Sequence, residues 1–212
     1  MLKLFYSPNA CSLASHAALE EAGAPYELQL VDLKSGQQRS GEYLKINPKG
    51  RVPALVTERG ILTETPAILA YIAQSYPQAR LADLTDPFAF ASIQAFNVYL
   101  ASTVHVAFAH VFRPGRYADG EAAAAAMKAK AHEALDEAFG VIDERLADGR
   151  PFVHGAQYSI SDPYLMVLER WFTEGKIGHP ERFAHVRAHR ARVEARPAIR
   201  RVLGAEGLRT DS

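Results

Sequence analysis

The chain has 212 residues with 24 basic and 24 acidic side chains, and 48% of its residues are hydrophobic. This composition indicates a folded protein with one large or two small domains, and it excludes disordered and low-complexity classes. Because the net charge is zero, no overall field draws the chain to nucleic acid or to anionic lipid. The single cysteine, Cys11, excludes an intrachain disulfide and a Cys-cluster zinc site. We expect a soluble, cytoplasmic protein with no metal, no membrane partner and no nucleic-acid partner.

The first eighty residues alternate short strand-like and helix-like patterns. Strands are expected over 2–6, 27–31, 54–57 and 60–63, and helices over 12–22, 41–46 and 66–76. Thr65 is expected to cap the last of these helices, with Pro66 at its first position. The order β-α-β-α-β-β-α predicts a small α/β domain over residues 1–80.

After a linker at about 80–85, the pattern is helical to the end, which predicts an all-α domain over 87–212. Residues 87–112 include no Asp, Glu, Lys or Arg and would suit a bilayer span by length. Polar side chains inside this segment would be costly in hydrocarbon. We therefore expect a helix, capped by Asp86, that is buried in protein on most of its circumference. Further helices are expected from Asp119, from the capping motif Ser159–Asp162, and over 181–194 and 197–203.

Cys11 lies at the junction of the first strand and the first helix. Unpaired N–H groups and the positive dipole end of a helix both favour a thiolate in its first turn. The alternative is a small buried hydrophobic residue. The junction position favours the reactive interpretation.

Two further segments are candidates for ligand binding. A proline that enters a strand, as Pro53 does, suits an edge or a special turn. If the Val52–Pro53 bond is cis, the backbone of Val52 turns outward and can pair with an extended peptide. At the start of the third helix, N–H groups and the Thr65 hydroxyl can hold a carboxylate, and Glu64 can bind an ammonium beside it. A plain helix cap is the alternative.

Four segments together resemble those of bacterial beta-class glutathione S-transferases. They are FYSPNACSLAS at 5–15, NPKGRVPAL at 47–55, LTE at 62–64 and SISDPY at 159–164. The resemblance implies a thioredoxin-like, glutathione-binding domain over 1–80 and an all-helical domain over 87–212 that contributes the electrophile pocket. It further implies a cis peptide at Pro53, a homodimer, and an enzyme that joins the glutathione thiolate to small hydrophobic electrophiles.

The resemblance also implies roles for particular residues. Cys11 and His105 are the catalytic candidates, because Cys11 matches a cysteine beside the glutathione sulfur and His105 a histidine that approaches the thiol. The backbone of Val52 would pair with the cysteinyl part of glutathione, and Glu64 and Thr65 would hold its γ-glutamyl end. The remaining candidates for contacts with glutathione are Ala10, Lys34 for the glycine carboxylate, and Asn97 and Ser102, which resemble residues that reach across a dimer.

Several alternatives stay open at this level. The donor to the thiolate is the Cys11 thiol, the Ser12 hydroxyl, a backbone N–H at 11–12 or the His105 imidazole, while Tyr6 is expected in the core. Cys11 could instead serve a glutathione-dependent thiol–disulfide or peroxide reductase. Seven arginines within 182–201 raise a non-catalytic, nucleic-acid-binding alternative, although a solvated helical face explains them more simply.

Overall fold

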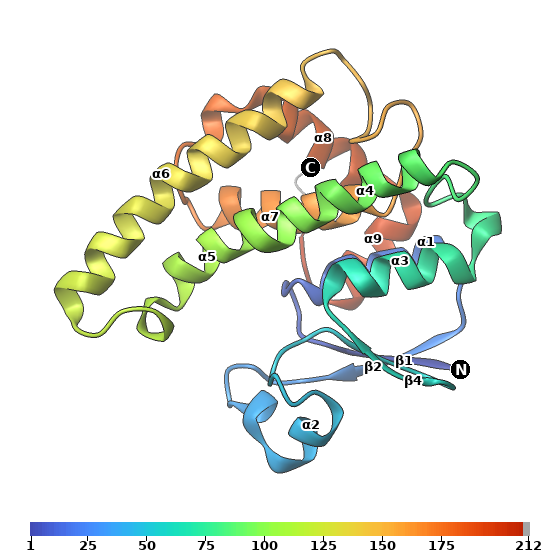
Figure 1. Ribbon diagram of the computed structural model, residues 1–212, viewed down its shortest axis with the longest axis horizontal. Coiled ribbons are helices and arrows are strands. Elements are labelled where there is room, and N and C mark those ends of the chain that lie inside the picture. The colour runs from blue at the N-terminus through green and yellow to red at the C-terminus, as the bar shows by residue number, and fades with distance from the viewer. Residues whose placement is uncertain (210–212) are drawn as a thin grey trace.

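A mixed four-stranded sheet forms the first part of the chain in the computed structural model, which describes residues 1–209 (Figure 1). The strands lie in the order β2-β1-β3-β4. β1 is parallel to β2, whereas the β1–β3 and β3–β4 pairs are antiparallel. Parallel neighbours need a crossover, which the first helix supplies. The bounds of these elements are β1 Leu2–Tyr6, α1 Ser12–Glu21, β2 Tyr26–Leu30, β3 Ala54–Thr57 and β4 Gly60–Thr63.

Helices cover both faces of this sheet. α1 and α3 (Thr65–Ser75) lie on one face and α2 (Gly41–Ile46) lies on the other (Figure 1). The two-residue period of β1 explains the division, because Leu4 packs into the main core while Phe5 joins a smaller cluster with Tyr43. The Phe5 and Tyr43 rings meet edge to face with their centroids 5.8 Å apart.

The rest of the chain is helical. α4 continues through a π-helical turn into α5, and this long helix packs against α6 and α7. Eleven side chains of α7 are buried, and α7 and α9 both pack on α1. These contacts attach the helical part to the α/β part. The bounds are α4 Pro87–Tyr99, π turn Leu100–Val104, α5 His105–Phe112, α6 Glu121–Leu146, α7 Ser161–Glu174, α8 Ala184–Glu194 and α9 Pro197–Ala205.

Every strand and helix expected from the sequence is present, but several ends differ. Thr65 is the first residue of α3 and Glu64 is its N-cap, and the Glu64 side chain makes no capping hydrogen bond. The expected Thr65 cap is therefore wrong, because the backbone enters the helix one residue earlier than a Thr65 cap requires. The alanine-rich helix begins at Glu121 after Gly120, whose φ of 84° suits glycine. The expected helix over 181–194 is a separate 3-10 turn followed by α8.

The uncharged helix is less buried than expected. One stripe along it does lie in the core, and Phe96, Leu100 and Phe108 belong to it. However, only 33% of its most apolar window is buried, and Phe88 and Val98 are 80% and 52% exposed. The expectation of burial on most of the circumference is wrong, since the fold covers one side of this helix. By length and hydropathy the segment could span a membrane.

Candidate functional site

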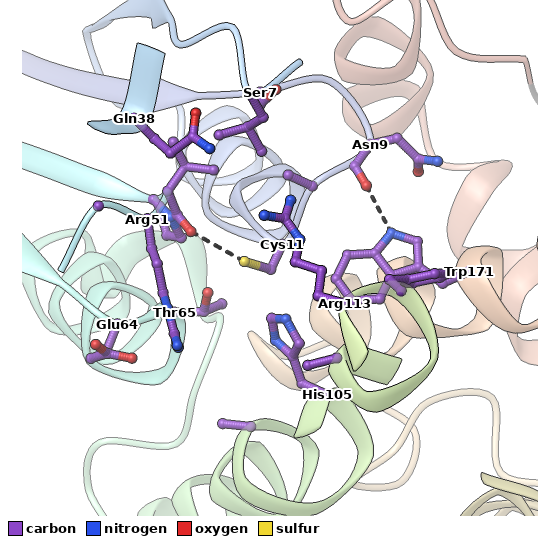
Figure 2. Close-up of a pocket in the computed structure, with 18 of the residues that line it drawn as sticks. Ser7, Asn9, Cys11, Gln38, Arg51, Glu64, Thr65, His105, Arg113 and Trp171 are labelled. Carbon is purple, nitrogen blue, oxygen red and sulfur yellow. Dashed lines mark hydrogen bonds between the residues drawn. The ribbon is translucent and has the colours of Figure 1, made fainter. Parts of the chain in front are cut away.

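A cavity of about 590 Å³ lies between the α/β part and the helical part. One wall is formed by the loop after β1, the segment before β3 and the start of α3. The opposite wall is formed by α5, the turn that follows α5, and α7. Figure 2 shows Cys11, Arg51 and Thr65 facing His105 and Trp171 across this cavity.

The loop after β1 aims Cys11 into the cavity. The Cys11 thiol donates a hydrogen bond to the carbonyl oxygen of Val52, 3.3 Å from Sγ (Figure 2). Ser12 fixes the loop from behind, because its hydroxyl donates to the Ser7 carbonyl and accepts from the Ser7 N–H. The indole N–H of Trp171 donates to the carbonyl of Asn9 at 2.7 Å. The loop is therefore held by bonds on both sides of Cys11.

Cys11 is a neutral thiol in this site. Burial raises its pKa to about 11, which hydrogen bonding by Thr65 and the positive charge of Arg51 only partly oppose. The sequence-based expectation of a thiolate at this helix end is wrong for this state of the protein. Desolvation of a buried charge outweighs the favourable helix end. At neutral pH the sulfur can therefore donate a hydrogen bond.

The segment before β3 presents the backbone of Val52. The Val52–Pro53 peptide bond is cis, as the resemblance implied. The carbonyl of Arg51 accepts hydrogen bonds from the Tyr43 hydroxyl at 2.7 Å and the Asn47 side-chain amide at 2.6 Å. These buried or half-buried partners fix the position of the loop at the cavity wall.

Two of the predicted binding residues lie at the start of α3. Thr65 is buried at the cavity wall, while Glu64 is exposed and has a positive φ of 72°. The Glu64 carboxylate bonds to the ammonium of Lys49, which also donates to the Thr63 hydroxyl. Helix N–H groups and a hydroxyl at one wall suit a carboxylate ligand.

His105 faces Cys11 from the helical wall. Its ring packs edge to face against Trp171, with centroids 5.0 Å apart. Burial lowers the pKa of His105 to about 4, and the positive charge of Arg51 acts in the same direction. The imidazole is therefore neutral at pH 7 and presents one N–H donor.

The cavity brings together most of the residues that the sequence singled out. Its lining includes Ala10, Cys11, Lys34, Val52, Glu64, Thr65 and His105. The prediction that Asn97 contacts glutathione is wrong, because its side chain is fully buried in the helical core and cannot reach a ligand. Ser102 is exposed outside the cavity and donates to the Val98 carbonyl. Ser12 and Tyr6 do not line the cavity, and Tyr6 packs against His16 as expected for a core aromatic.

Several lining residues were not identified from the sequence. Arg51 precedes Val52 in a segment that was already a candidate, so its position was the available signal. Arg113 and Arg116 follow α5, and only the fold shows that this turn reaches the cavity. Within residues 1–209, no group of three or more His, Cys, Asp or Glu side chains is arranged to hold a metal ion.

Comparison with known proteins gives consistent matches over the chain. The family model described as glutathione S-transferase, N-terminal domain, matches residues 1–74, and the model for the C-terminal domain of the same family matches residues 66–197. The glutathione S-transferase GstA of Escherichia coli O157:H7 is 35% identical over 98% of this chain and all of its own length. This relative therefore aligns with the chain from end to end.

Solved structures agree with this result. A glutathione transferase homolog from Sulfitobacter with bound glutathione has a TM-score of 0.90 and 36% identity, covering 99% of both chains. A sphingomonad glutathione S-transferase complexed with glutathione has a TM-score of 0.85 and 37% identity, covering 98% of this chain and all of that one. Both structures share the two-part architecture described above.

Proposed function

The chain belongs to the glutathione S-transferase family, and we propose that its cavity binds glutathione and joins the glutathione thiolate to small hydrophobic electrophiles. The observation that carries this proposal is the position of Cys11. Its neutral thiol lies beside the backbone of Val52 and the start of α3, at the bottom of a cavity shared by both parts of the chain.

The wall of the α/β part suits the peptide backbone of glutathione. We infer that the Val52 backbone pairs with the cysteinyl residue and that Thr65 and the first N–H groups of α3 receive the γ-glutamyl carboxylate. Glu64 stands beside them for the ammonium, and Lys34 stands at the mouth for the glycine carboxylate. Ala10 contributes backbone to the same wall.

Ionising the glutathione thiol is the main chemical task in this mechanism. A free thiol is only a few per cent thiolate at pH 7. Lowering its pKa by about two units needs about 2.7 kcal/mol of preferential stabilisation of the thiolate. One or two hydrogen bonds to the charged sulfur, each of about 1.5–3 kcal/mol, supply this. The Cys11 thiol and the neutral His105 imidazole are the donors we assign, and the positive charge of Arg51 adds to them.

The opposite wall suits the electrophile. Ala101, Val106, Ala109, Phe112 and Trp171 line the helical side of the cavity, as expected for a pocket between the two parts. Once bound there, the electrophilic carbon forms a bond to sulfur and its leaving group departs with the bonding electrons. The enzyme contributes ionisation and positioning.

We propose that the chain acts as a homodimer in the cytoplasm. Phe88 and Val98 are exposed apolar side chains of the α4–α5 helix outside the cavity, and Ser102 lies on the same helix. Exposed apolar patches of this kind mark protein contacts. A partner subunit would cover them, and Ser102 would then face that subunit.

The alternative roles receive less support. A neutral, partly buried Cys11 thiol is a poor nucleophile for disulfide or peroxide chemistry. Four of the seven arginines within 182–201 make ion pairs with carboxylates of the fold, which reduces the positive charge available to nucleic acid; they are Arg182, Arg190, Arg196 and Arg201.

Calorimetry and a conjugation assay test the proposed function together. We expect the purified protein to bind glutathione and its analogue ophthalmic acid, in which a methyl group replaces the thiol. We expect conjugation of 1-chloro-2,4-dinitrobenzene with glutathione only. Folded protein that binds neither tripeptide at millimolar concentration would contradict the proposal.

A further inference from the structure

The cavity has an unbalanced charge. Its lining includes four basic side chains, Lys34, Arg51, Arg113 and Arg116, and one acidic side chain, Glu64. The Glu64 carboxylate already bonds to Lys49 outside the lining. The cavity is therefore electropositive in a chain whose net charge is zero. A cleft lined by one sign of charge raises the local concentration of the opposite sign.

Two of these basic residues belong to the helical wall. Arg113 and Arg116 lie in the turn after α5, and both are exposed at the mouth of the cavity. Figure 2 shows the Arg113 side chain extending from the helical wall towards Cys11. Among residues 1–209, no carboxylate forms an ion pair with either guanidinium.

The electrostatic environment of Arg116 confirms that positive charges gather here. Partial burial lowers its pKa, and the charges of Arg113, Arg51 and Arg39 lower it further. Like charges held close together are unfavourable unless an anion neutralises them. A guanidinium binds a carboxylate through two parallel hydrogen bonds, which makes it suited to such an anion.

Glutathione does not account for these two arginines in the proposed pose. Its γ-glutamyl carboxylate is assigned to the start of α3, and its glycine carboxylate to Lys34. Arg113 and Arg116 stand on the other wall, beside the apolar surface formed by Phe112 and Trp171. That wall therefore combines an apolar surface with a cationic rim.

We propose that the preferred second substrate is an aromatic electrophile that carries a carboxylate, with its ring on Phe112 and Trp171 and its carboxylate on Arg113 and Arg116. This inference rests on the proposed function and specifies its substrate class. In the reaction of a chloroarene, the thiolate sulfur forms a bond to the ring carbon, the carbon–chlorine bond breaks and chloride leaves with the electron pair. The thiol proton goes to solvent, so no further reactant is needed.

A matched pair of electrophiles tests the proposal. 4-Chloro-3-nitrobenzoate carries the carboxylate, and 4-chloro-3-nitrobenzamide is its neutral isostere. For each, kcat/KM is divided by the uncatalysed rate constant with glutathione, which removes the difference in intrinsic reactivity. We expect this ratio to favour the carboxylate by about tenfold or more, as charge-assisted hydrogen bonds predict. Because the rim is exposed, the preference should fall as salt is raised.

The double variant Arg113→Gln with Arg116→Gln should lower kcat/KM for the benzoate by about 10- to 100-fold and leave the benzamide within about threefold. Arg59→Gln is the matched control, because Arg59 is an exposed arginine in the β3–β4 turn outside the cavity. It should change neither value.

Three results would overturn the inference. The wild-type enzyme could turn over the benzamide as well as the benzoate after normalisation. The double variant could keep the preference for the benzoate. It could instead raise the KM for glutathione equally with both electrophiles, which would assign the arginines to the tripeptide. Loss of glutathione binding in calorimetry is a separate result that would overturn the proposed function itself.

Discussion

Cys11 illustrates how two physical effects compete at one residue. Its position at the N-terminus of α1 favours a thiolate, whereas its burial favours the neutral thiol. The structure shows that burial is the larger effect, with the pKa raised to about 11. The sulfur that ionises in the proposed reaction is therefore that of glutathione, and Cys11 assists it as a hydrogen-bond donor.

Replacement of Cys11 tests this assignment. Cys11→Ala removes the donor and should lower kcat/KM for a neutral chloroarene by about tenfold at pH 7, the effect of one hydrogen bond to a charged group. Cys11→Ser keeps a donor at the same place and should recover most of the activity. Steady-state kinetics of the three proteins check both values. If Cys11→Ala kept full activity, the thiol would have no part in transfer.

His105 makes a prediction about pH. Because its pKa is lowered to about 4, the imidazole stays neutral across the working range. His105→Gln retains an N–H donor without titrating, so its pH profile of kcat/KM should have the same shape as that of the wild type between about pH 5 and about pH 8. A loss confined to the acidic end of the profile would show instead that the imidazolium is the active form.

The candidate site could be predicted in part from the sequence, for a physical reason. Cys11, Val52 and Thr65 lie next to turns and helix starts, and such places have recognisable local patterns. Arg113 and Arg116 carry no local signal, because only the packing of α5 beside α7 brings their turn to the cavity. Asn97 was misplaced because a polar residue on an apolar helix does not show by its position whether it faces a partner or the core.

At the level of elements, the start of α7 was the best-predicted feature of the helical part. Asp162 accepts hydrogen bonds from the Ser159 N–H at 2.7 Å and from the Ser159 hydroxyl, while the Ser159 oxygen accepts from the Ser161 N–H. The opposed hydrogen bonds that the motif predicted are confirmed, although the N-cap residue of α7 is Ile160 and the helix begins at Ser161. The Asp162 carboxylate also bonds to His189 of α8, with 2.9 Å between Oδ1 and Nε2. No local sequence motif indicates this contact between helices.

His189 links α7 to α8 through buried charges. Burial by itself would lower its pKa, but the carboxylates of Glu169 and Asp162 override this and raise the pKa to about 10. The folded protein therefore keeps the proton up to about pH 10, whereas the unfolded chain releases it near 6.5. The contribution of His189 to stability is complete below the lower value and is lost as pH rises through the upper one.

His189→Gln should remove this pH dependence and lower the free energy of unfolding by about 3–5 kcal/mol at neutral pH, because the two carboxylates lose their buried counter-charge. His185→Gln is the matched control, since His185 also lies on α8 but pairs with Asp143 of α6 while 47% exposed. It should cost less than about 1 kcal/mol. Denaturant unfolding measured across the alkaline range checks both variants. An equal decrease in the free energy of unfolding in the two variants would contradict this role of His189.

At the scale of the whole molecule, the sequence pattern predicted the order of the two parts. Strand-like alternation stops and helix-like periodicity takes over near residue 80, and the structure follows this change. The boundary we place between residues 80 and 87 remains a prediction. Exposure of the α4–α5 helix could not be predicted, because an uncharged sequence looks the same whether its own fold or a second subunit covers it.

The proposed dimer gives a prediction at the same scale. Val98→Arg places a charge on the exposed apolar side of α4, and we expect it to convert the dimer to a monomer in light scattering. Val141→Arg is the matched control, because Val141 is 60% exposed on α6, a different helix. It should leave the mass unchanged. A wild-type protein that is already monomeric would overturn the proposed assembly.

The central claim is that the cavity binds glutathione and lowers the pKa of its thiol. The ultraviolet absorbance of the thiolate in the complex with glutathione, followed against pH, measures this directly, and the complex with ophthalmic acid supplies the blank. We expect bound glutathione to titrate about two units below free glutathione, the shift that one or two donors at the sulfur provide. A bound thiol that titrates at the value of the free tripeptide would contradict the account.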